Sequence, residues 1–255
     1  MSMKNIGQAQ SDHVVETVKR AIPLVLVLSL LGAGLSYEIY SDALSVSAWP
    51  WRIGVLVALV CCAGLLFVYA RYRGSNDLYA YGLVMSIGTF SAYYFFGVFG
   101  YFCYFMFAPM PAVVRWPGLI GGVALNFFWA MVVRRSVRHT IDATPFLDKV
   151  INEQGGELIY DVQQGATEFD RFHKEPDIMP KFAKYLIFGI APFYLILNRV
   201  LSSNFGSNGV LLFLAVLGMP LALLFVSLFV RNYILMIALP KQIEKERGKR
   251  VLVAE

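Results

Sequence analysis

Charged residues are scarce in this sequence. Only 15% of its 255 residues are Asp, Glu, Lys or Arg, whereas a typical soluble domain has about a quarter. In contrast, 58% are hydrophobic and the mean hydropathy is +0.60. Charged side chains are absent from the middle of every long apolar run. A water-facing surface needs such side chains, so the composition excludes a soluble globular protein and predicts an integral membrane protein.

The sequence also lacks the signatures of several chemistries. It has no phosphate-binding glycine loop, no GxSxG and no HExxH motif. Its three cysteines, Cys61, Cys62 and Cys103, lie in apolar runs without ligand partners at metal spacing, so we expect them to be apolar core residues. We therefore expect no catalytic residue, no cofactor and no metal. The net charge of +5 comes from Lys and Arg that flank apolar runs, so it does not indicate nucleic-acid binding.

The apolar residues form six runs, which predict an all-α fold of about six transmembrane helices. The runs cover 21–37, 53–70, 78–108, 112–133, 185–200 and 210–240. A spanning helix needs about 20 apolar residues, so the first run is short, and the third is long enough to tilt or to end in the interface. A turn cluster over 202–209 separates the last two runs. Five or seven spans remain open, and we expect no cleavable signal peptide because the first 20 residues are polar.

The basic residues predict the orientation of these helices. If six helices alternate from an inside N-terminus, only Arg52, Arg115 and Arg199 of the 22 basic residues fall outside. Cytoplasmic loops carry an excess of Lys and Arg, so the pattern predicts that both termini are in the cytoplasm. It suits a multi-pass protein of the bacterial inner membrane.

This topology divides the chain into five segments. They are a cytoplasmic arm over 1–20, a four-helix transmembrane half over 21–133, a cytoplasmic insert over 134–184, a two-helix hairpin over 185–240 and a charged cytoplasmic tail over 241–255. Within the insert, Thr144-Pro145 predicts a helix start, Gly155-Gly156 its end, and 157–162 a short strand. About 50 residues are marginal for an independent core, so we expect the insert to pack on the membrane surface or on another protein.

Four residues in the spans are candidate contacts for a ligand or a partner. Asn126 is the main polar side chain of the fourth run, and it either contacts a ligand or hydrogen-bonds a neighbouring helix. Arg231 lies near the cytoplasmic end of the sixth run, where it either reaches headgroups or pairs with a ligand or a loop carboxylate such as Asp77. Pro192 and Pro220 are expected to break the fifth and sixth runs at similar depths, and broken helices expose carbonyls that coordinate substrates.

An aromatic stretch over 93–107 is the least ordinary segment, since ten of its fifteen residues are Phe or Tyr. It is interpreted either as an aromatic belt with lipid-facing bulk or as a docking surface for another membrane protein or a bulky apolar ligand. Its candidate contact residues are Tyr93, Tyr94, Phe95 and Phe96. A second cluster, from Glu168 to Asp177, includes His173, but its spacing matches no zinc pattern and a solvated loop explains it.

Three classes of function follow from these features. The first is a protein that acts by protein–protein interaction, as a subunit of a membrane assembly or as an immunity-type protein against a membrane-acting toxin. The second is a small channel or transporter, which the expected helix breaks motivate. The third is a membrane enzyme acting on a lipid-linked substrate. The expected partners are the lipid bilayer and another membrane protein or a second copy of the chain, and not nucleic acid.

Overall fold

The computed structural model describes residues 12–154, 156–173 and 179–254. Among these residues, five helices are long and apolar enough to cross a membrane. They cover His13–Ala43, Trp49–Tyr72, Leu78–Phe107, Ala112–Ala143 and Asn208–Arg247. The bent pair Lys181–Ile190 and Leu195–Asn204 makes a sixth if it forms one span. The chain is therefore a multi-pass helical membrane protein, as the apolar runs predict.

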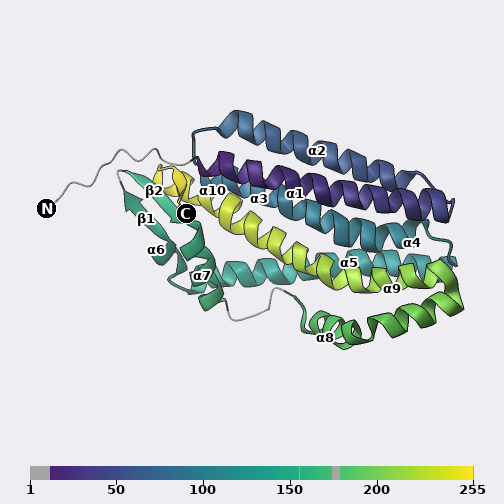
Figure 1. Ribbon diagram of the computed structural model, residues 1–255. Coiled ribbons are helices and arrows are strands. Elements are labelled where there is room, and N and C mark those ends of the chain that lie inside the picture. Colours follow the sequence, from purple (N-terminus) through teal and green to yellow (C-terminus); the bar gives the residue numbers. More distant parts are fainter. Residues whose placement is uncertain (1–11, 155, 174–178, 255) are drawn as a thin grey trace.

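The first half of the chain builds most of the bundle seen in Figure 1. Its elements are α1 (His13–Ser36) with the π-helix η1 (Tyr37–Ala43), α2 (Trp49–Tyr72), α3 (Leu78–Tyr93), the π-helix η2 (Tyr94–Phe102), α4 (Cys103–Phe107) and α5 (Ala112–Ala143). The carboxylate of Asp12 caps α1 by accepting from the Val15 amide (3.0 Å), and it also accepts from the Gly74 amide (2.6 Å). This one side chain therefore ties the start of α1 to the end of α2.

The second half contains shorter elements and one long kinked helix. They are α6 (Phe146–Val150), β1 (Ile151–Gln154), β2 (Glu157–Asp161), α7 (Val162–Phe172), α8 (Lys181–Ile190), the 3₁₀ turn η3 (Ala191–Phe193), α9 (Tyr194–Tyr233), the π-helix η4 (Ile234–Ala238), α10 (Leu239–Arg247) and β3 (Val251–Ala254). The strand expected over 157–162 is observed as β2. The helix expected to end at Gly155 is shorter, because Ile151 already begins β1.

The expected cap of that helix is wrong. The structure places Pro145 at the capping position and shows no side-chain hydrogen bond there. The Thr144 hydroxyl instead donates to the Thr140 carbonyl (2.6 Å), one turn back in α5. A Thr hydroxyl between two helices can hydrogen-bond the backbone of either helix, and here it bonds the helix that precedes it.

A small sheet joins the insert to the C-terminal tail. The strand order is β1-β2-β3, with β1 antiparallel and β3 parallel to β2, and Leu158 lies opposite Val251. Gly248 ends α10 with a positive φ of 67°, a conformation that favours glycine, and so turns the chain into β3. The tail read from the sequence as a charged extension is thus a helix and a strand.

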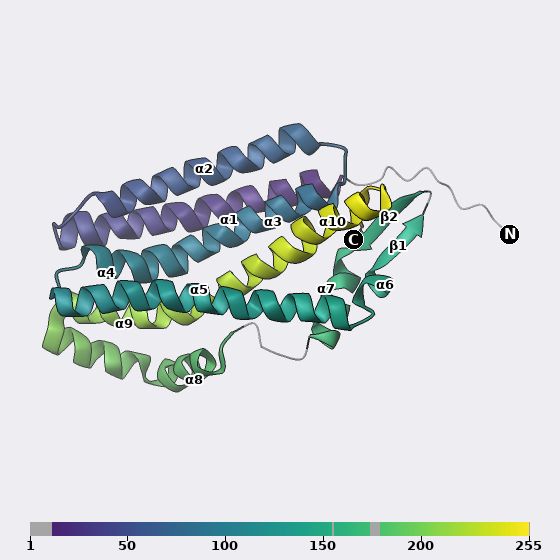
Figure 2. The ribbon, with the colours of Figure 1, turned by 180° about the vertical axis from the view of Figure 1, so that it is seen from behind.

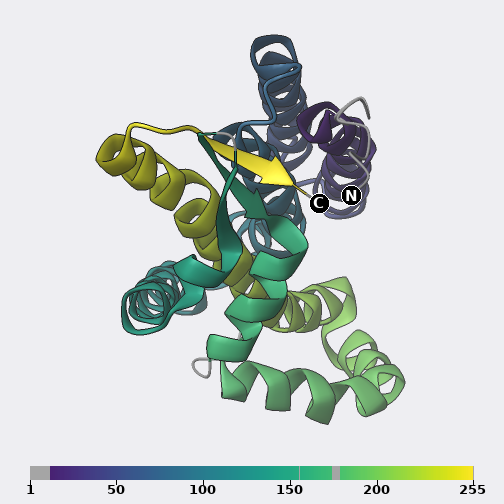
Figure 3. The same ribbon diagram turned by 90° about the vertical axis from the view of Figure 1, so that its left-hand side faces the viewer.

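Four distant segments meet at this end of the bundle, which Figure 3 shows from the front. The Asn76 carbonyl accepts from the Val253 amide (2.8 Å), and its side-chain oxygen accepts from the His13 amide (2.9 Å). Phe146 and Phe169 of the insert belong to the same apolar core as the long helices. The insert therefore packs on its own bundle.

The two prolines expected to break helices behave differently. At Pro192 the chain leaves the α-helix for a 3₁₀ turn, and the flanking helices enclose an angle of 82°. The expectation of a break at Pro220 is wrong, because α9 continues through it. Helix α9 departs from helical geometry at Gly206 (φ 59°, ψ −150°), so the turn cluster expected over 202–209 is helical apart from this residue.

Candidate functional site

The bent segment around Pro192 differs from the rest of the bundle, and we call residues 181–204 the arm. It comprises α8, η3 and the first turns of α9, as far as the kink near Gly206. The Asn208 side chain fixes its base by donating to the Pro109 carbonyl (2.8 Å). Figures 1 and 2 both show α8 alongside the bundle, between its two ends. The break at Pro192 therefore lies at the depth of the spanning helices.

Little of the arm is covered by the rest of the chain. Among its described side chains only Ala183 is buried, whereas Tyr185 is 75% exposed and Leu195 77% exposed. Within the part of the chain that the structure describes, α8 makes its substantial contacts only with η3 and α9. The arm thus exposes large apolar side chains, and the rest of the chain covers few of its described side chains.

A break such as the one in the arm can leave backbone polar groups without hydrogen-bond partners. A helix end leaves up to four carbonyls, and the next helix start up to four amides, without partners inside the helix. In hydrocarbon each unsatisfied group costs several kcal/mol, and non-helical backbone is tolerated at membrane depth only where protein or water covers it. Pro192 and Phe193 are exposed in the isolated chain. Asn198 adds to this, because its side-chain oxygen is buried without a hydrogen-bond partner among the described residues.

The four aromatic candidates take part in packing within the chain. Tyr94 is only 1% exposed, and its ring lies against the glycine faces of α1 and α2. Phe96 stacks on Phe225 of α9 with ring centroids 5.4 Å apart, and Tyr93 and Phe95 are half-buried. The structure therefore does not bring these four together as one exposed face.

Asn126 and Pro220 lie near each other where α5 crosses α9. The Asn126 amide group donates to the Gly122 carbonyl (2.8 Å) and lies 3.5 Å from the sulfur of Met219. Pro220 is buried directly after Met219. A Cβ on Gly218 would lie 3.0 Å from the Phe96 carbonyl oxygen, so the chain around Pro220 serves close packing against η2.

Arg231 joins the end of α9 to the insert. Its guanidinium donates to the Asp170 carboxylate (2.8 Å) and lies over the Phe169 ring, 4.3 Å from its centroid. The carboxylate partner is thus Asp170 of α7 and not Asp77. His173 stacks on the same Phe169 ring, and the two ring centroids lie 4.8 Å apart. Arg231 therefore positions α7 on the bundle.

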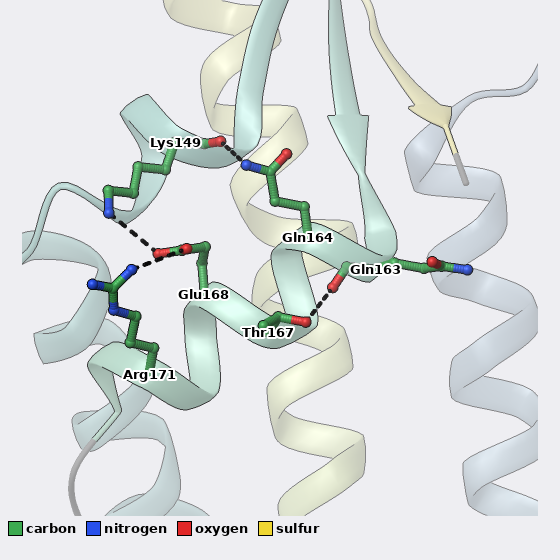
Figure 4. Close-up of polar contacts among 6 residues, drawn as sticks. All are labelled: Lys149, Gln163, Gln164, Thr167, Glu168 and Arg171. Carbon is green, nitrogen blue, oxygen red and sulfur yellow. Dashed lines mark hydrogen bonds and ion pairs between the residues drawn. The ribbon is translucent and has the colours of Figure 1, made fainter.

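The outer face of α7 carries ordinary surface pairs, which Figure 4 shows. The Glu168 carboxylate lies between Lys149 (3.4 Å) and Arg171 (3.5 Å), and the Gln164 side chain donates to the Lys149 carbonyl (3.0 Å). Exposed pairs of this kind are worth about 0–1 kcal/mol each. In the described residues no group of three or more His, Cys, Asp or Glu could hold a metal. Glu175 and Asp177, which belong to the expected cluster, lie outside the described residues.

Comparison with known proteins gives no match to this chain. No protein-family model matches the chain, and neither a curated protein nor a solved structure is significantly similar to it.

Proposed function

We propose that this chain is a six-span membrane protein that acts by binding another membrane protein through the arm. The observation that carries the proposal is the break at Pro192, which lies between the two helices of the bent pair and is uncovered in the isolated chain. A helix of a partner laid across the break would shield its backbone groups from lipid and could donate to the Asn198 side-chain oxygen.

The proposed orientation puts both termini in the cytoplasm of a bacterial inner membrane. The segments with most basic residues, at the ends of α2 and α5 and in α10, gather at the sheet end of the bundle. Arg52 and Arg115 begin α2 and α5 at the other end. This separation supports an inside location for the sheet. The arm then serves as the fifth span, crossing with a bend.

The partner is proposed to be a different protein and not a second copy. A twofold contact centred on the break would bring two Arg199 side chains into one interface, because Arg199 lies about 9 Å along the helix from Phe193. Like charges in apolar surroundings repel strongly. A partner with an acceptor or a carboxylate at that level avoids this cost.

The other two classes of function receive less support. Transport was motivated by two breaks, and α9 passes unbroken through Pro220. Enzymatic action on a lipid-linked substrate depends on the polar cluster from Asp170 to Asp177, and the Asp170 carboxylate is occupied by its ion pair with Arg231.

Site-specific photo-crosslinking in the native host tests the proposal. A photoreactive residue at Phe188 or Leu195 should yield one discrete adduct, identified by mass spectrometry as another membrane protein. The identity of the crosslinked protein would show whether the partner is a toxin or a subunit of an assembly. The matched control is Leu59, which is similarly exposed and belongs to α2, on the opposite side of the bundle from α8 in Figure 1. An adduct of two copies, or equal labelling at Leu59, would contradict the proposal.

A further inference from the structure

A groove opens on the bundle where α5 and α9 part. At their crossing the Trp129 indole donates to the Ser227 hydroxyl (2.7 Å). Beyond this point Figure 2 shows α5 running straight on, while η4 and α10 turn away from it. A π-helix is wider than an α-helix and is common at functional sites. The space between the two walls measures about 370 Å³.

The groove is apolar along its floor and basic at its mouth. Phe127, Ala130, Arg134 and Arg138 lie on one face of α5, because they are spaced three or four residues apart. Phe229 and Tyr233 are among the residues of the opposite wall. Phe127 and Tyr233 are largely exposed, so the floor is open to the hydrocarbon side.

The two arginines at the mouth are not neutralised within the described residues. Neither Arg134 nor Arg138 forms an ion pair there. The nearest carboxylate along α5 is Asp142, one turn beyond Arg138, and it lines an adjoining cleft of about 310 Å³ together with Gln242. The mouth of the groove thus carries two cations, and Asp142 lies in a neighbouring cleft that the same two arginines also line.

The dimensions of the groove match one leaflet of a bilayer. From Phe127 to Arg138 the helix rises about 16 Å, and half of a hydrocarbon core is about 15 Å. Basic residues between helices at a membrane face bind anionic headgroups, and exposed apolar walls below them accept an acyl chain. A free phosphate would use only the mouth and leave the floor uncovered.

We infer that this groove is a binding site for an anionic phospholipid. The phosphate lies between Arg134 and Arg138, and one acyl chain lies along the floor between Phe127 and Phe229. This inference is independent of the arm, which consists of residues 181–204, contributes no residue to the groove and is proposed to bind protein.

Native mass spectrometry of the detergent-solubilised chain tests it, with phosphatidylglycerol, phosphatidylcholine of equal chain length and inorganic phosphate as probes. We expect saturable binding of one phosphatidylglycerol and neither of the others. The double variant Arg134→Gln/Arg138→Gln should raise the dissociation constant about thirty-fold, since each basic contact with an anionic headgroup contributes roughly a factor of five. The control Arg71→Gln/Arg73→Gln removes the same charge from the end of α2. An equal loss in that control would overturn the inference.

A second variant separates the groove from surface charge. Ala130→Trp fills the floor and keeps both arginines, so it should weaken phosphatidylglycerol binding about tenfold or more. Unchanged affinity in this variant would show that the lipid is held at the surface by charge alone and would overturn the site. Competition by inorganic phosphate at millimolar concentration would do the same, because it would show a phosphate site without a lipid floor.

Discussion

Two regions of this molecule solve the problem of packing in lipid in opposite ways. In the region formed by α1, α2 and α3, which we call the closed region, glycines allow close approach: a Cβ on Gly54 would lie 2.8 Å from that of Ala33. Between α1 and α3, the Ser29 and Ser91 hydroxyl oxygens lie 3.1 Å apart and hydrogen-bond each other. In the arm, by contrast, nothing lies within 4 Å of a Cβ on Gly189, and the hydrogen bonds of the Asn204 side chain stay within its own turn of helix.

This difference shows which surface features carry information in a membrane protein. Both regions expose large apolar side chains, for example Leu59 in α2 and Phe188 in the arm. Lipid tails are as apolar as these side chains, so their exposure alone does not indicate a partner. An exposed helix break does, because lipid cannot hydrogen-bond the backbone groups that a break leaves without partners.

The largest effect should come from disturbing the closed region. Gly54→Leu places a side chain where a Cβ alone would lie 2.6 Å from the Tyr94 hydroxyl, so we expect a loss of about 1–3 kcal/mol or more, or a loss of folded protein. The measurement is the thermal unfolding midpoint in detergent. Gly34→Leu is the matched control, because nothing lies within 4 Å of its Cβ, and it should unfold like the wild type.

The same substitution in the arm sharpens the comparison. Gly189 also has open space around its Cβ, so Gly189→Leu should leave the midpoint of the isolated chain unchanged. A large fall in that midpoint would contradict the view that the arm is unpacked.

A smaller effect is expected at the joint between bundle and insert. Arg231 is only partly exposed and holds both Asp170 and the Phe169 ring, so Arg231→Gln should cost about 1 kcal/mol. Hydrogen exchange should show faster opening of α7. Arg171→Gln removes an exposed pair of the same helix and should change little. Equal effects from the two variants would show that Arg231 does not position the insert.

In the arm, Asn198→Leu separates stability from binding. Removing an unsatisfied amide should leave the isolated chain as stable as before or slightly more so. Loss of an interhelical hydrogen bond in lipid costs about 0.6 kcal/mol, so the yield of the crosslinked adduct from Phe188 should fall about threefold. An unchanged yield would mean that the partner does not use this side chain.

The spanning helices could be predicted because a long run without charged residues is visible in the local sequence. The break at Pro192 could be predicted because proline lacks an amide hydrogen. The same signal failed at Pro220, where close packing of Gly218 on η2 holds the helix together. β3 gave almost no signal, since four residues are too few for a pattern and the partner strand is about 90 residues away.

The candidate sites were harder to predict than the helices. In the sequence, Arg134 and Arg138 simply follow the end of an apolar run. They lie at the mouth of a groove only because α5 diverges from η4. The aromatic candidates were the opposite case. The composition of 93–107 is unusual, but Tyr94 is buried and packs within the chain. Whether a side chain faces a partner depends on how helices cross, and that information is distributed over distant residues.

The smallest predicted effect concerns the sheet, where Lys249, just before β3, pairs with Glu153 of β1. The hydrogen bond and charge of Lys249 lower the pKa of this exposed carboxyl, with a weaker contribution from Arg247. A lowered pKa stabilises the fold above the ordinary glutamate value of about 4.3, and the contribution is lost as pH falls through the folded value. Hydrogen exchange of the β3 amides should therefore be slower in the wild type than in Glu153→Gln at pH 7, and this difference should be smaller at pH 3. A constant difference at both pH values would show that the pair does not act through the charge of Glu153. The closed region has no such exposed pair among its described interhelical contacts, so its exchange should not differ between the two proteins at either pH.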